Sequence, residues 1–526
     1  MVTATASRRT VSDPAASPVA NRGLITATVI CACVMQGLDT TIVNVSLPHI
    51  QGSMSAAQDQ ISWVLTSYIV SSAITMPLTG WIAGRFGIRY IFLASVIGFT
   101  VASALCGAAA SLNQLVLYRV LQGIFSAGLV PLGQATLFTI YPREKHGQAM
   151  AIFATGAMMG PIIGPTLGGW LTENLDWRWC FYINLPVGVL CAFGLFLFIR
   201  QAPTVRRDQF DLFGFAALSI GVGALQLMLD RGQVKDWFHS PEICIEGAVS
   251  AVSFYLLIVH TLTTGENSFL NRELMKSPNF VAGSLLMFSV GMILSGTLAL
   301  MPSMMQDLMN YPVFDAGWMM APRGFGAMLA MFLVARVIDR IDSRLFILVG
   351  FLMTAASLWQ MTGYSLLMGS GPIIFAGFAQ GFGLGCTFVP LNLLALSGLP
   401  PHILAQGTAI RALMRMLGGS IGIAILEAEL AQNTQIVHSR LNEWLRPDNP
   451  LARHLAAPFS FTDPSGVAAL NHEVTRQAAM IGYIDDYRLM QLVILASLPL
   501  LLLVRVPRRR KRTAAGGMPT PAAADD

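Results

Sequence analysis

The sequence predicts an all-α integral membrane protein with fourteen membrane-spanning helices. Of its 526 residues, 54% are hydrophobic and only 12% are charged, and the mean hydropathy is +0.60. Soluble domains carry about 25% charged residues, so a soluble protein is excluded. A helix needs about 20 apolar residues to cross a bilayer core. Stretches of that kind lie near 24–47, 61–83, 89–110, 114–140, 147–171, 180–200, 211–229, 242–262, 280–304, 317–338, 345–366, 371–397, 408–430 and 488–505.

The first apolar stretch, 24–47, is expected to span the membrane rather than to be a cleavable signal, whose apolar region is only about 7–15 residues long. Basic residues favour the cytoplasmic loops of membrane proteins. They gather here in five loops of one set, whereas the alternate loops 51–60, 110–113 and 306–318 lack them. Both termini are therefore predicted to be cytoplasmic, and the net charge of +5 is no indication of nucleic-acid binding. The basic loop residues are Arg85, Arg89, Arg143, Lys145, Arg206, Arg207, Arg272, Lys276, Arg340 and Arg344.

An internal repeat relates the two ends of the chain. The fourth predicted helix contains Gln122-Gly123, and the twelfth contains Gln380-Gly381, each followed by a further glycine and a Pro-Leu pair. Two six-helix halves with two additional helices between them explain this pattern. The predicted parts are a cytoplasmic tail (1–22), a six-helix bundle (23–202), a linker with two extra helices (203–270), a second bundle (271–506) that includes an outer loop (431–487), and a cytoplasmic basic tail (507–526).

Asp39 is the outstanding charge within a predicted membrane helix. A carboxylate at that depth costs roughly 2.5–3.5 kcal/mol on insertion scales and normally has a function. Arg119 lies at a similar depth of the fourth helix, so the two side chains are expected to pair. A carboxylate beside a cation ionises easily and takes up a proton when it loses that cation. A static buried ion pair is the alternative interpretation.

The fifth predicted helix contains glycines at every fourth position, Gly156, Gly160 and Gly164, together with Pro161 and Pro165. Small residues at this spacing allow two helix backbones to pack closely in lipid. Prolines bend a helix, and neighbouring helices can bond to the freed carbonyl groups. A simple helix contact is the alternative to a special function.

Three further arginines lie in predicted membrane helices. Arg323 is near the outer end of the tenth helix, and Arg411 and Arg415 are in the inner half of the thirteenth. Arg411 is expected to extend to the cytoplasmic surface. Arg415 lies deeper and is the stronger candidate for a function.

The loop 431–487 is much longer than a helix connection requires. Its early part is rich in turn-forming residues, and its later part has apolar residues at helical spacing between Val467 and Tyr487. The last membrane helix is therefore expected to extend outward into this part. The apolar face either packs on neighbouring helices or binds a partner protein.

Several motifs together resemble a known family. They are Leu38-Asp39-Thr40-Thr41-Ile42-Val43-Asn44, Arg119-x-x-Gln122-Gly123, the run from Gly156 to Gly169, Trp177-Arg178-Trp179, and Ile183-Asn184-Leu185-Pro186-Val187-Gly188. Over essentially the whole chain they resemble the fourteen-helix drug:proton antiporter family of the major facilitator superfamily, of the EmrB/QacA type. The resemblance implies the major facilitator fold.

The resemblance also implies roles for individual residues. The arginine of the family's fourth-helix motif is implicated in proton coupling, and Arg119 occupies its place. The charge and depth of Asp39 make it the predicted proton-binding partner. Candidates for the substrate pathway or for gating are Asn44, Gln122, Gly156, Gly160, Pro161, Gly164, Pro165, Arg323 and Arg415.

The cytoplasmic loop motif of this superfamily, Gly-x-x-x-Asp-Arg-x-Gly-Arg, is altered here because Gly84 replaces its aspartate. That aspartate normally locks the cytoplasmic gate. The lock is therefore expected to be weaker, or to depend on the second-half pair Asp339-Arg340. The residues assigned to this gate are Gly80, Arg85, Gly87, Arg89, Asp339 and Arg340.

The resulting hypothesis is a multidrug efflux permease of the bacterial inner membrane that exchanges hydrophobic or amphipathic drug-like molecules for protons. It would need no cofactor besides the proton gradient. The long outer loop resembles that of relatives that work with a periplasmic membrane-fusion adaptor and a TolC-type outer-membrane channel. A proton-coupled transporter of one metabolite and a non-transporting receptor are the alternatives. No nucleophile–base pair, phosphate loop or metal cluster supports an enzyme.

Overall fold

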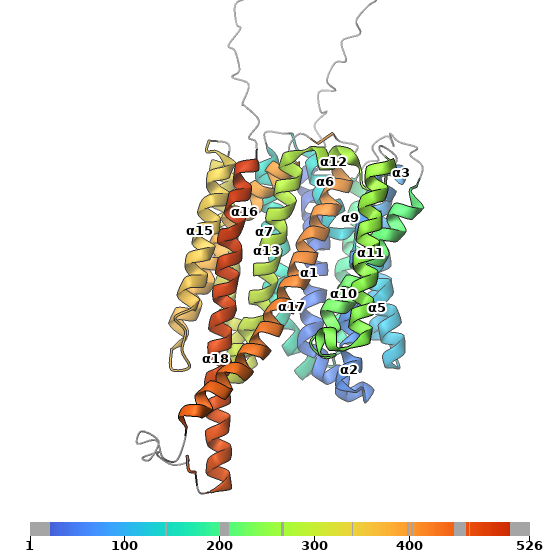
Figure 1. Ribbon diagram of the computed structural model, residues 1–526. Coiled ribbons are helices and arrows are strands. Elements are labelled where there is room, and N and C mark those ends of the chain that lie inside the picture. Colours follow the sequence, from blue (N-terminus) through green and yellow to red (C-terminus); the bar gives the residue numbers. More distant parts are fainter. Residues whose placement is uncertain are drawn as a thin grey trace, which may run out of the picture.

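The computed structural model describes residues 21–142, 145–199, 210–264, 268–338, 340–396, 399–400, 403–445, 459–461 and 463–504. The regular elements in these ranges are all helices, which confirms the predicted all-α fold. The long helices run side by side through one bundle (Figure 1). We call the end at which α1 begins, uppermost in Figure 1, the inner end, following the predicted topology, and the opposite end the outer end.

The first group of helices corresponds to the first six predicted spans. Two of these spans are broken, α5 from α6 near Gly128 and α8 from α9 at Ile183. The elements are α1 (Arg22–Met54), α2 (Gln58–Ile61), α3 (Trp63–Phe86), α4 (Ile88–Gly107), α5 (Leu112–Ser126), α6 (Leu129–Ile140), α7 (His146–Asn174), α8 (Trp179–Tyr182) and α9 (Asn184–Phe198).

The remaining helices include the two inserted ones and a second group. The inserted pair is α10 (Leu212–Arg231) and α11 (Pro241–Thr264), joined through η2 (Trp237–His239). The second group is α12 (Arg272–Lys276), α13 (Pro278–Ser303), η4 (Met304–Leu308), α14 (Val313–Val337), α15 (Ser343–Met361), α16 (Ser370–Leu396), α17 (Leu404–Trp444), α18 (Pro464–Ser497) and η7 (Leu498–Leu503).

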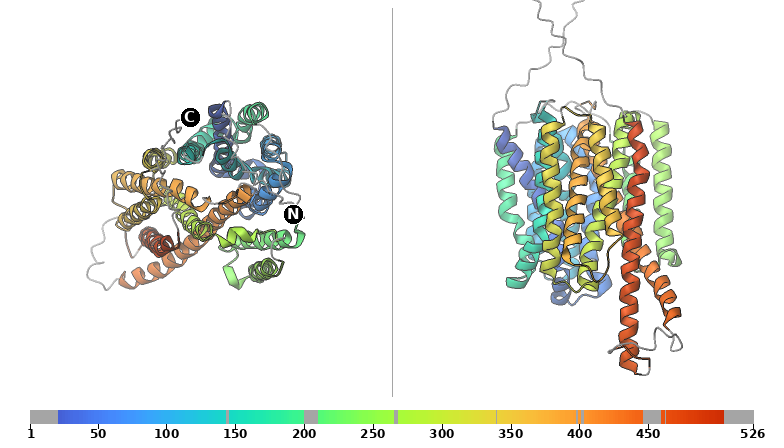
Figure 2. Two further views of the ribbon diagram at one scale, coloured as in Figure 1. Left: turned by 90° about the horizontal axis from the view of Figure 1, so that it is seen from above. Right: turned by 90° about the vertical axis from the view of Figure 1, so that its left-hand side faces the viewer.

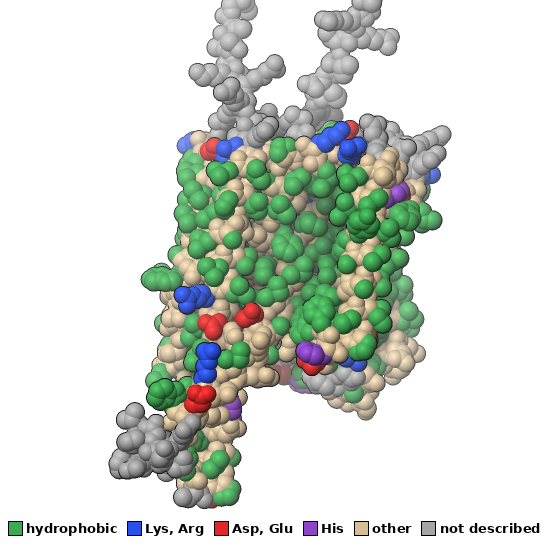
Figure 3. All heavy atoms as spheres, in the orientation of Figure 1, with side chains coloured by type: hydrophobic (Ala, Val, Ile, Leu, Met, Phe, Trp, Pro, Cys, Tyr) green, Lys and Arg blue, Asp and Glu red, His purple; other side chains and the backbone are tan. Residues whose placement is uncertain are grey.

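Twelve helical segments of the described chain are long and apolar enough to cross a membrane. The other two predicted spans, 61–83 and 147–171, fall on α3 and α7, which have 24 and 29 residues. Both pack within the bundle, α3 against α5 and α7 against α1. A multi-pass membrane protein is thus established, and fourteen crossings remain a prediction. Hydrophobic side chains are spread over the side of the bundle in Figure 3.

The two groups of helices meet along α7 and α14 and along α3 and α17. The helices α10 and α11 pack on each other at one edge of the bundle, where α10 also contacts α3 and α17 (Figure 2). Asp211 fixes the start of α10, because its carboxylate accepts hydrogen bonds from the backbone N–H groups of Gly214 and Phe269 and pairs with His260. The predicted domain boundaries themselves remain predictions.

The segment predicted to be an outer loop, 431–487, is helical at both ends. The helix α17 has 41 residues and continues to Trp444, and α18 begins at Pro464, well before the predicted span 488–505. The prediction that the last membrane helix extends outward is therefore confirmed, but α17 is longer than predicted. Both helices project beyond the outer end of the bundle (Figure 1). The predicted turns at 447–458 lie outside the described residues.

Candidate functional site

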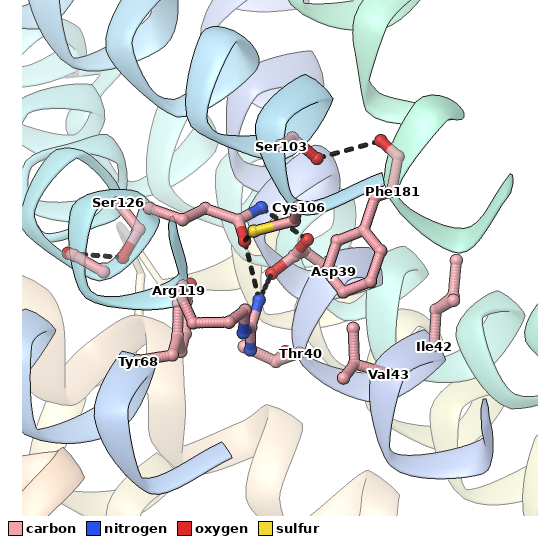
Figure 4. A network of polar contacts seen from close by, with 12 residues as sticks. Asp39, Thr40, Ile42, Val43, Tyr68, Ser103, Cys106, Arg119, Ser126 and Phe181 are labelled. Carbon is pink, nitrogen blue, oxygen red and sulfur yellow. Dashed lines mark hydrogen bonds and ion pairs between the residues drawn. The ribbon is translucent and has the colours of Figure 1, made fainter. Parts of the chain in front are cut away.

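Asp39 forms the centre of a buried polar network, which we call the N-terminal site. Its side chain is fully buried, and its Oδ2 atom lies 2.8 Å from Nη1 of Arg119. Its Oδ1 atom accepts hydrogen bonds from Nε2 of Gln122 at 2.7 Å and from Nδ2 of Asn184 at 3.0 Å. The pairing expected from similar depth is therefore present (Figure 4).

Arg119 is held by several groups besides Asp39. Its Nε atom donates to the carbonyl oxygen of Val64 at 3.0 Å, and Nη1 also donates to Oε1 of Gln122 at 2.8 Å. The Tyr68 ring lies on the guanidinium, with 4.2 Å between the ring centroid and Cζ. A desolvated cation over an aromatic face gains about 2 kcal/mol from this contact. The arginine is thus fixed at the depth of Asp39.

Helix geometry explains why these residues meet. Arg119 and Gln122 are three residues apart on α5 and so share one face. Gly123 follows, and a Cβ atom there would lie only 2.5 Å from the carbonyl oxygen of Tyr68 on α3. The missing side chain therefore allows α5 to approach α3 closely and places the Arg119 face against α1.

Asn184 belongs to the network although it was not among the predicted site residues, whereas Asn44, predicted for the substrate pathway or gating, lies outside the network. Asn184 is the first residue of α9, is 1% exposed, and also donates to Oγ of Ser103 at 3.0 Å. Its place among the polar residues at the start of the sixth predicted helix was a usable signal. Asn44 is exposed and takes no part in the network, because it lies on another face of α1 than Asp39.

The glycines of α7 bring that helix against the segment of α1 that carries Asp39. A Cβ atom on Gly160 would lie 2.7 Å from the carbonyl carbon of Gly37, and one on Gly164 would overlap the side chain of Thr41. Gly156 is similarly close to Ile30. The predicted close packing is present. The side chains of Pro161 and Pro165 lie outside the described part of the structure.

The three other membrane arginines differ in their surroundings. Arg323 is 6% exposed and donates from Nη2 to the carbonyl oxygen of Leu294 at 3.3 Å. Arg415 is partly buried in α17. Arg411 does not extend to the surface as predicted, since it is only 1% exposed.

Arg411 instead connects the two groups of helices. Its Nη2 atom donates to Oε1 of Gln134 on α6 at 3.3 Å and to Oδ1 of Asn392 on α16. One turn earlier on α17, the Thr408 hydroxyl donates to the carbonyl oxygen of Pro131 at 3.2 Å. Charged side chains in membrane segments usually face the bundle interior and pair there with polar groups, as Arg411 does with Gln134 and Asn392.

The gate residues surround a tight contact at the inner end. A Cβ atom on Gly80 would lie 2.7 Å from Cα of Gln406, so α3 and α17 touch through their backbones there. Arg89 donates to the carbonyl oxygen of Phe196 at 2.8 Å, and Arg85 lies over the Trp81 ring. A Cβ atom at Gly84 would find no other atom within 4 Å.

The other members of the gate set are Gly87, Arg340 and Asp339. Gly87 has a φ angle of 96°, which an L side chain rarely adopts, and it separates α3 from α4. Arg340 is exposed, and Asp339 lies outside the described residues.

The sequence profile of the Major Facilitator Superfamily matches residues 29–423. The chain belongs to this superfamily. It is 36% identical over 464 residues to the multidrug export protein EmrB of Escherichia coli K12, covering 87% of this chain and 90% of that protein. It is 34% identical over 482 residues to the fatty acid resistance protein FarB of Neisseria gonorrhoeae, covering 90% and 94%. The resemblance seen in the motifs is confirmed.

Solved structures of this fold include two similar proteins. The human organic anion transporter MFSD10 has a TM-score of 0.58 at 14% identity, covering 90% of this chain and 99% of that protein. The proton:xylose symporter XylE has a TM-score of 0.57 at 14% identity, covering 90% and 95%. These likenesses establish the major facilitator fold, and the family is one of transporters rather than enzymes.

Proposed function

We propose that this protein is a proton-driven multidrug efflux permease of the bacterial inner membrane, with both termini in the cytoplasm. The observation that carries the proposal is the buried Asp39–Arg119 pair with its amide partners Gln122 and Asn184. The identity of 34–36% to EmrB and FarB supports export of hydrophobic or amphipathic molecules. The proton gradient is the energy source, and no cofactor takes part.

The N-terminal site binds the driving proton at Asp39. A carboxylate only accepts hydrogen bonds, and all three donors to Asp39 fit that species. A proton from the outer side neutralises the carboxylate and weakens its attraction to Arg119. The change acts on the part of α1 that is packed on Gly160 and Gly164 of α7. Since α7 also contacts α14 of the second group, this packing transmits the change across the molecule.

The inner gate closes through contacts that do not use an aspartate at position 84. The backbone contact of Gly80 with Gln406 and the Gln134–Arg411–Asn392 hydrogen bonds join the two groups at the inner end. They supply the lock that the altered loop motif lacks. Lys and Arg side chains gather at this end in Figure 3, as expected of a cytoplasmic face.

The projecting parts of α17 and α18 bind a periplasmic adaptor of the membrane-fusion type, which connects the permease to a TolC-type outer-membrane channel. Arg476 fixes α18 to the outer end of the bundle by donating to the carbonyl oxygen of Leu308, and it pairs with Glu473 at 2.9 Å. Val467, nearer the tip of α18, is 46% exposed, so its apolar surface is available to a partner.

Transport in liposomes tests the proposed function. The purified protein is reconstituted with an acidic interior, and ethidium (a cation) and 8-anilino-1-naphthalenesulfonate (an anion) serve as amphipathic probes. An exporter of this kind takes up at least one probe while protons leave, and the gradient is required. A symporter moves probe and proton in the same direction, and a receptor moves neither. Either result, against protein-free liposomes as control, would refute the proposed function.

A further inference from the structure

The second group of helices contains a counterpart of the N-terminal site. Nε2 of Gln380 donates to the Thr297 hydroxyl at 3.1 Å, as Nε2 of Gln122 does to Asp39. Gly381 is packed on the carbonyl oxygen of Arg323, as Gly123 is packed on that of Tyr68. Thr297 therefore stands in the place of Asp39. The helix α18 reaches this group through Met490, whose Sδ atom accepts from the Thr297 hydroxyl at 3.7 Å. We call Thr297, Arg323 and Gln380, together with Asp486 and Tyr487 of α18, the C-terminal site.

Asp486 is the unusual member of this site. Its side chain is 0% exposed, on the buried face of α18 that also carries Tyr483 and Tyr487. Neither carboxyl oxygen has a hydrogen-bond partner among the described residues. An unpaired charge in such surroundings costs far more than a neutral polar group, so an ionised Asp486 is strongly disfavoured.

The charged groups around Asp486 increase this cost. The carboxylates of Glu429 and Asp485, which act on Asp486, carry the same sign as an ionised Asp486 would. Arg323, the buried cation of the site, forms no hydrogen bond with Asp486 in the described structure. Among the titratable and charged groups on the elements packed here are Tyr483, Asp485, Tyr487 and the exposed Arg488 on α18, Glu427 and Glu429 on α17, Asp307 on η4, Tyr364 after α15, and Arg323 on α14.

We propose that Asp486 is a second proton-binding site of the transport cycle and that it holds its proton in the conformation seen here. That the proton is used in transport rests on the proposed function, whereas its binding to Asp486 does not. Asp39 and Asp486 are then in opposite protonation states. Asp39 has three donors and is ionised, whereas Asp486 has no donor among the described residues and is neutral.

The location of Asp486 fits proton exchange with the outer side. Tyr487, its neighbour, donates from its hydroxyl to Sδ of Met304, where α13 gives way to η4 at the outer end. The ring of Tyr487 also lies 5.9 Å from that of Tyr364, which follows the outer end of α15. A proton from the outer solution forms an O–H bond with a carboxyl oxygen of Asp486. It leaves as H⁺ when movement of α17 or α18 exposes the carboxylate to water or to Nη1 of Arg323, which has no partner among the described residues.

Infrared spectroscopy of the whole protein in lipid nanodiscs at neutral pH tests the proton directly. A protonated carboxyl group has a carbonyl stretch that a carboxylate lacks. We expect Asp486→Asn to remove this band and Asp486→Glu to shift it, whereas Asp39→Asn and Asp485→Asn leave it unchanged. Asp485 is the matched control, being the neighbouring and partly exposed carboxylate on the same helix. The proposal would be overturned if the band were the same in wild type, Asp486→Asn and Asp486→Glu. Two variants are used so that the test still holds if one of them folds poorly.

Transport then shows whether the proton is used. The number of protons released per ethidium taken up is measured in liposomes for wild type and Asp486→Asn. We expect the variant to release fewer protons per ethidium. An unchanged ratio, with wild type active, would overturn the role in the cycle while leaving the proposed function intact. If wild type moves no probe but the infrared band depends on Asp486, the proposed function fails and the proton-binding site stands.

Discussion

The N-terminal and C-terminal sites have the same packing arrangement but opposite polar chemistry. In both, a Gln-Gly pair on one helix lies against the backbone of a second helix, and the glutamine donates to a third. In the N-terminal site each oxygen of Asp39 has a donor. In the C-terminal site, Nη1 of Arg323, Oε1 of Gln380 and both carboxyl oxygens of Asp486 are without partners among the described residues.

The two halves of the internal repeat therefore share close helix packing but not the positions of their charged residues. The glycines carry the packing in both groups, as in Gly164 against Thr41 and Gly422 against Met292. The charged groups lie on different helices in the two sites, so only the N-terminal site forms an ion pair. Buried polar groups whose hydrogen bonds are all made hold one arrangement of the helices. Buried polar groups without partners gain free energy by binding a proton or a new partner.

The largest expected difference between the sites concerns their arginines. Arg119→Gln leaves Asp39 buried without its cation, and breaking a buried pair in this way costs about 3–5 kcal/mol. Arg323→Gln removes a buried cation that has no anionic partner in the described structure, so it should be nearly neutral or stabilising. Thermal unfolding in detergent measures both. Equal destabilisation by the two variants would show that the sites do not differ in pairing.

Substitution of one packing glycine in each group of helices distinguishes an effect on stability from an effect on proton coupling. Gly164→Leu and Gly422→Leu both add volume at a tight contact, at about 1–3 kcal/mol each. We expect both to lower thermal stability, but only Gly164→Leu to change the protons exchanged per ethidium, because α7 packs on the helix of Asp39. Gly169→Leu is the control, since a Cβ atom there would have its nearest contact at 3.9 Å. An unchanged number of protons exchanged per ethidium in Gly164→Leu would show that the packing of α7 on α1 takes no part in proton coupling.

Arg411→Gln tests whether the inner lock is independent of both sites. The variant loses the guanidinium hydrogen bonds to Gln134 and Asn392, and bonds to charged groups are worth about 1.5–3 kcal/mol each. We expect α6 and α17 to separate at the inner end, measured as a longer distance between spin labels on these helices. Arg415→Gln, one turn further along α17, should leave that distance unchanged. An unchanged distance in Arg411→Gln would place the lock elsewhere.

The smallest effect is expected at Asp211, which belongs to neither site. Burial opposes its charge, but hydrogen bonds from the backbone of Gly214 and Phe269 and from His260 outweigh this and lower the pKa of Asp211 below its usual 3.8. Because the pKa is lowered in the folded state, Asp211 contributes its full share to the free energy of unfolding at pH values above 3.8. That share is lost as the pH falls below 3.8 through the lowered pKa. Asp211→Ala should cost about 1 kcal/mol in thermal unfolding at neutral pH, with transport retained. A loss of transport would connect α10 to the coupling mechanism.

The sequence predicted the N-terminal site better than the C-terminal one for a physical reason. Asp39 stands alone in an apolar run, so its burial and its pairing with Arg119 followed from helix length and depth. Asp486 lies in a mixed polar stretch that reads as an outer loop, and only the course of α18 shows that it is buried.

Partners from distant parts of the chain were harder to predict. Arg411 was expected at the surface because its long side chain could reach the cytoplasmic end of its helix. Its actual partners, Gln134 on α6 and Asn392 on α16, are brought to it only by the packing of the two groups of helices. The extension of α17 to Trp444 was missed because its outer part is polar on most faces and resembles a loop.

Proton-driven transport by Asp39→Asn tests the central claim most directly. The substitution keeps the shape of the side chain but removes the group that binds the proton. Ethidium accumulation driven by a pH gradient is compared in liposomes with exchange of ethidium for ethidium at equal pH on both sides. We predict that accumulation is lost and that exchange continues. Accumulation of ethidium against its gradient by the Asp39→Asn variant would contradict the account, because Asp39 would then not be required for proton coupling.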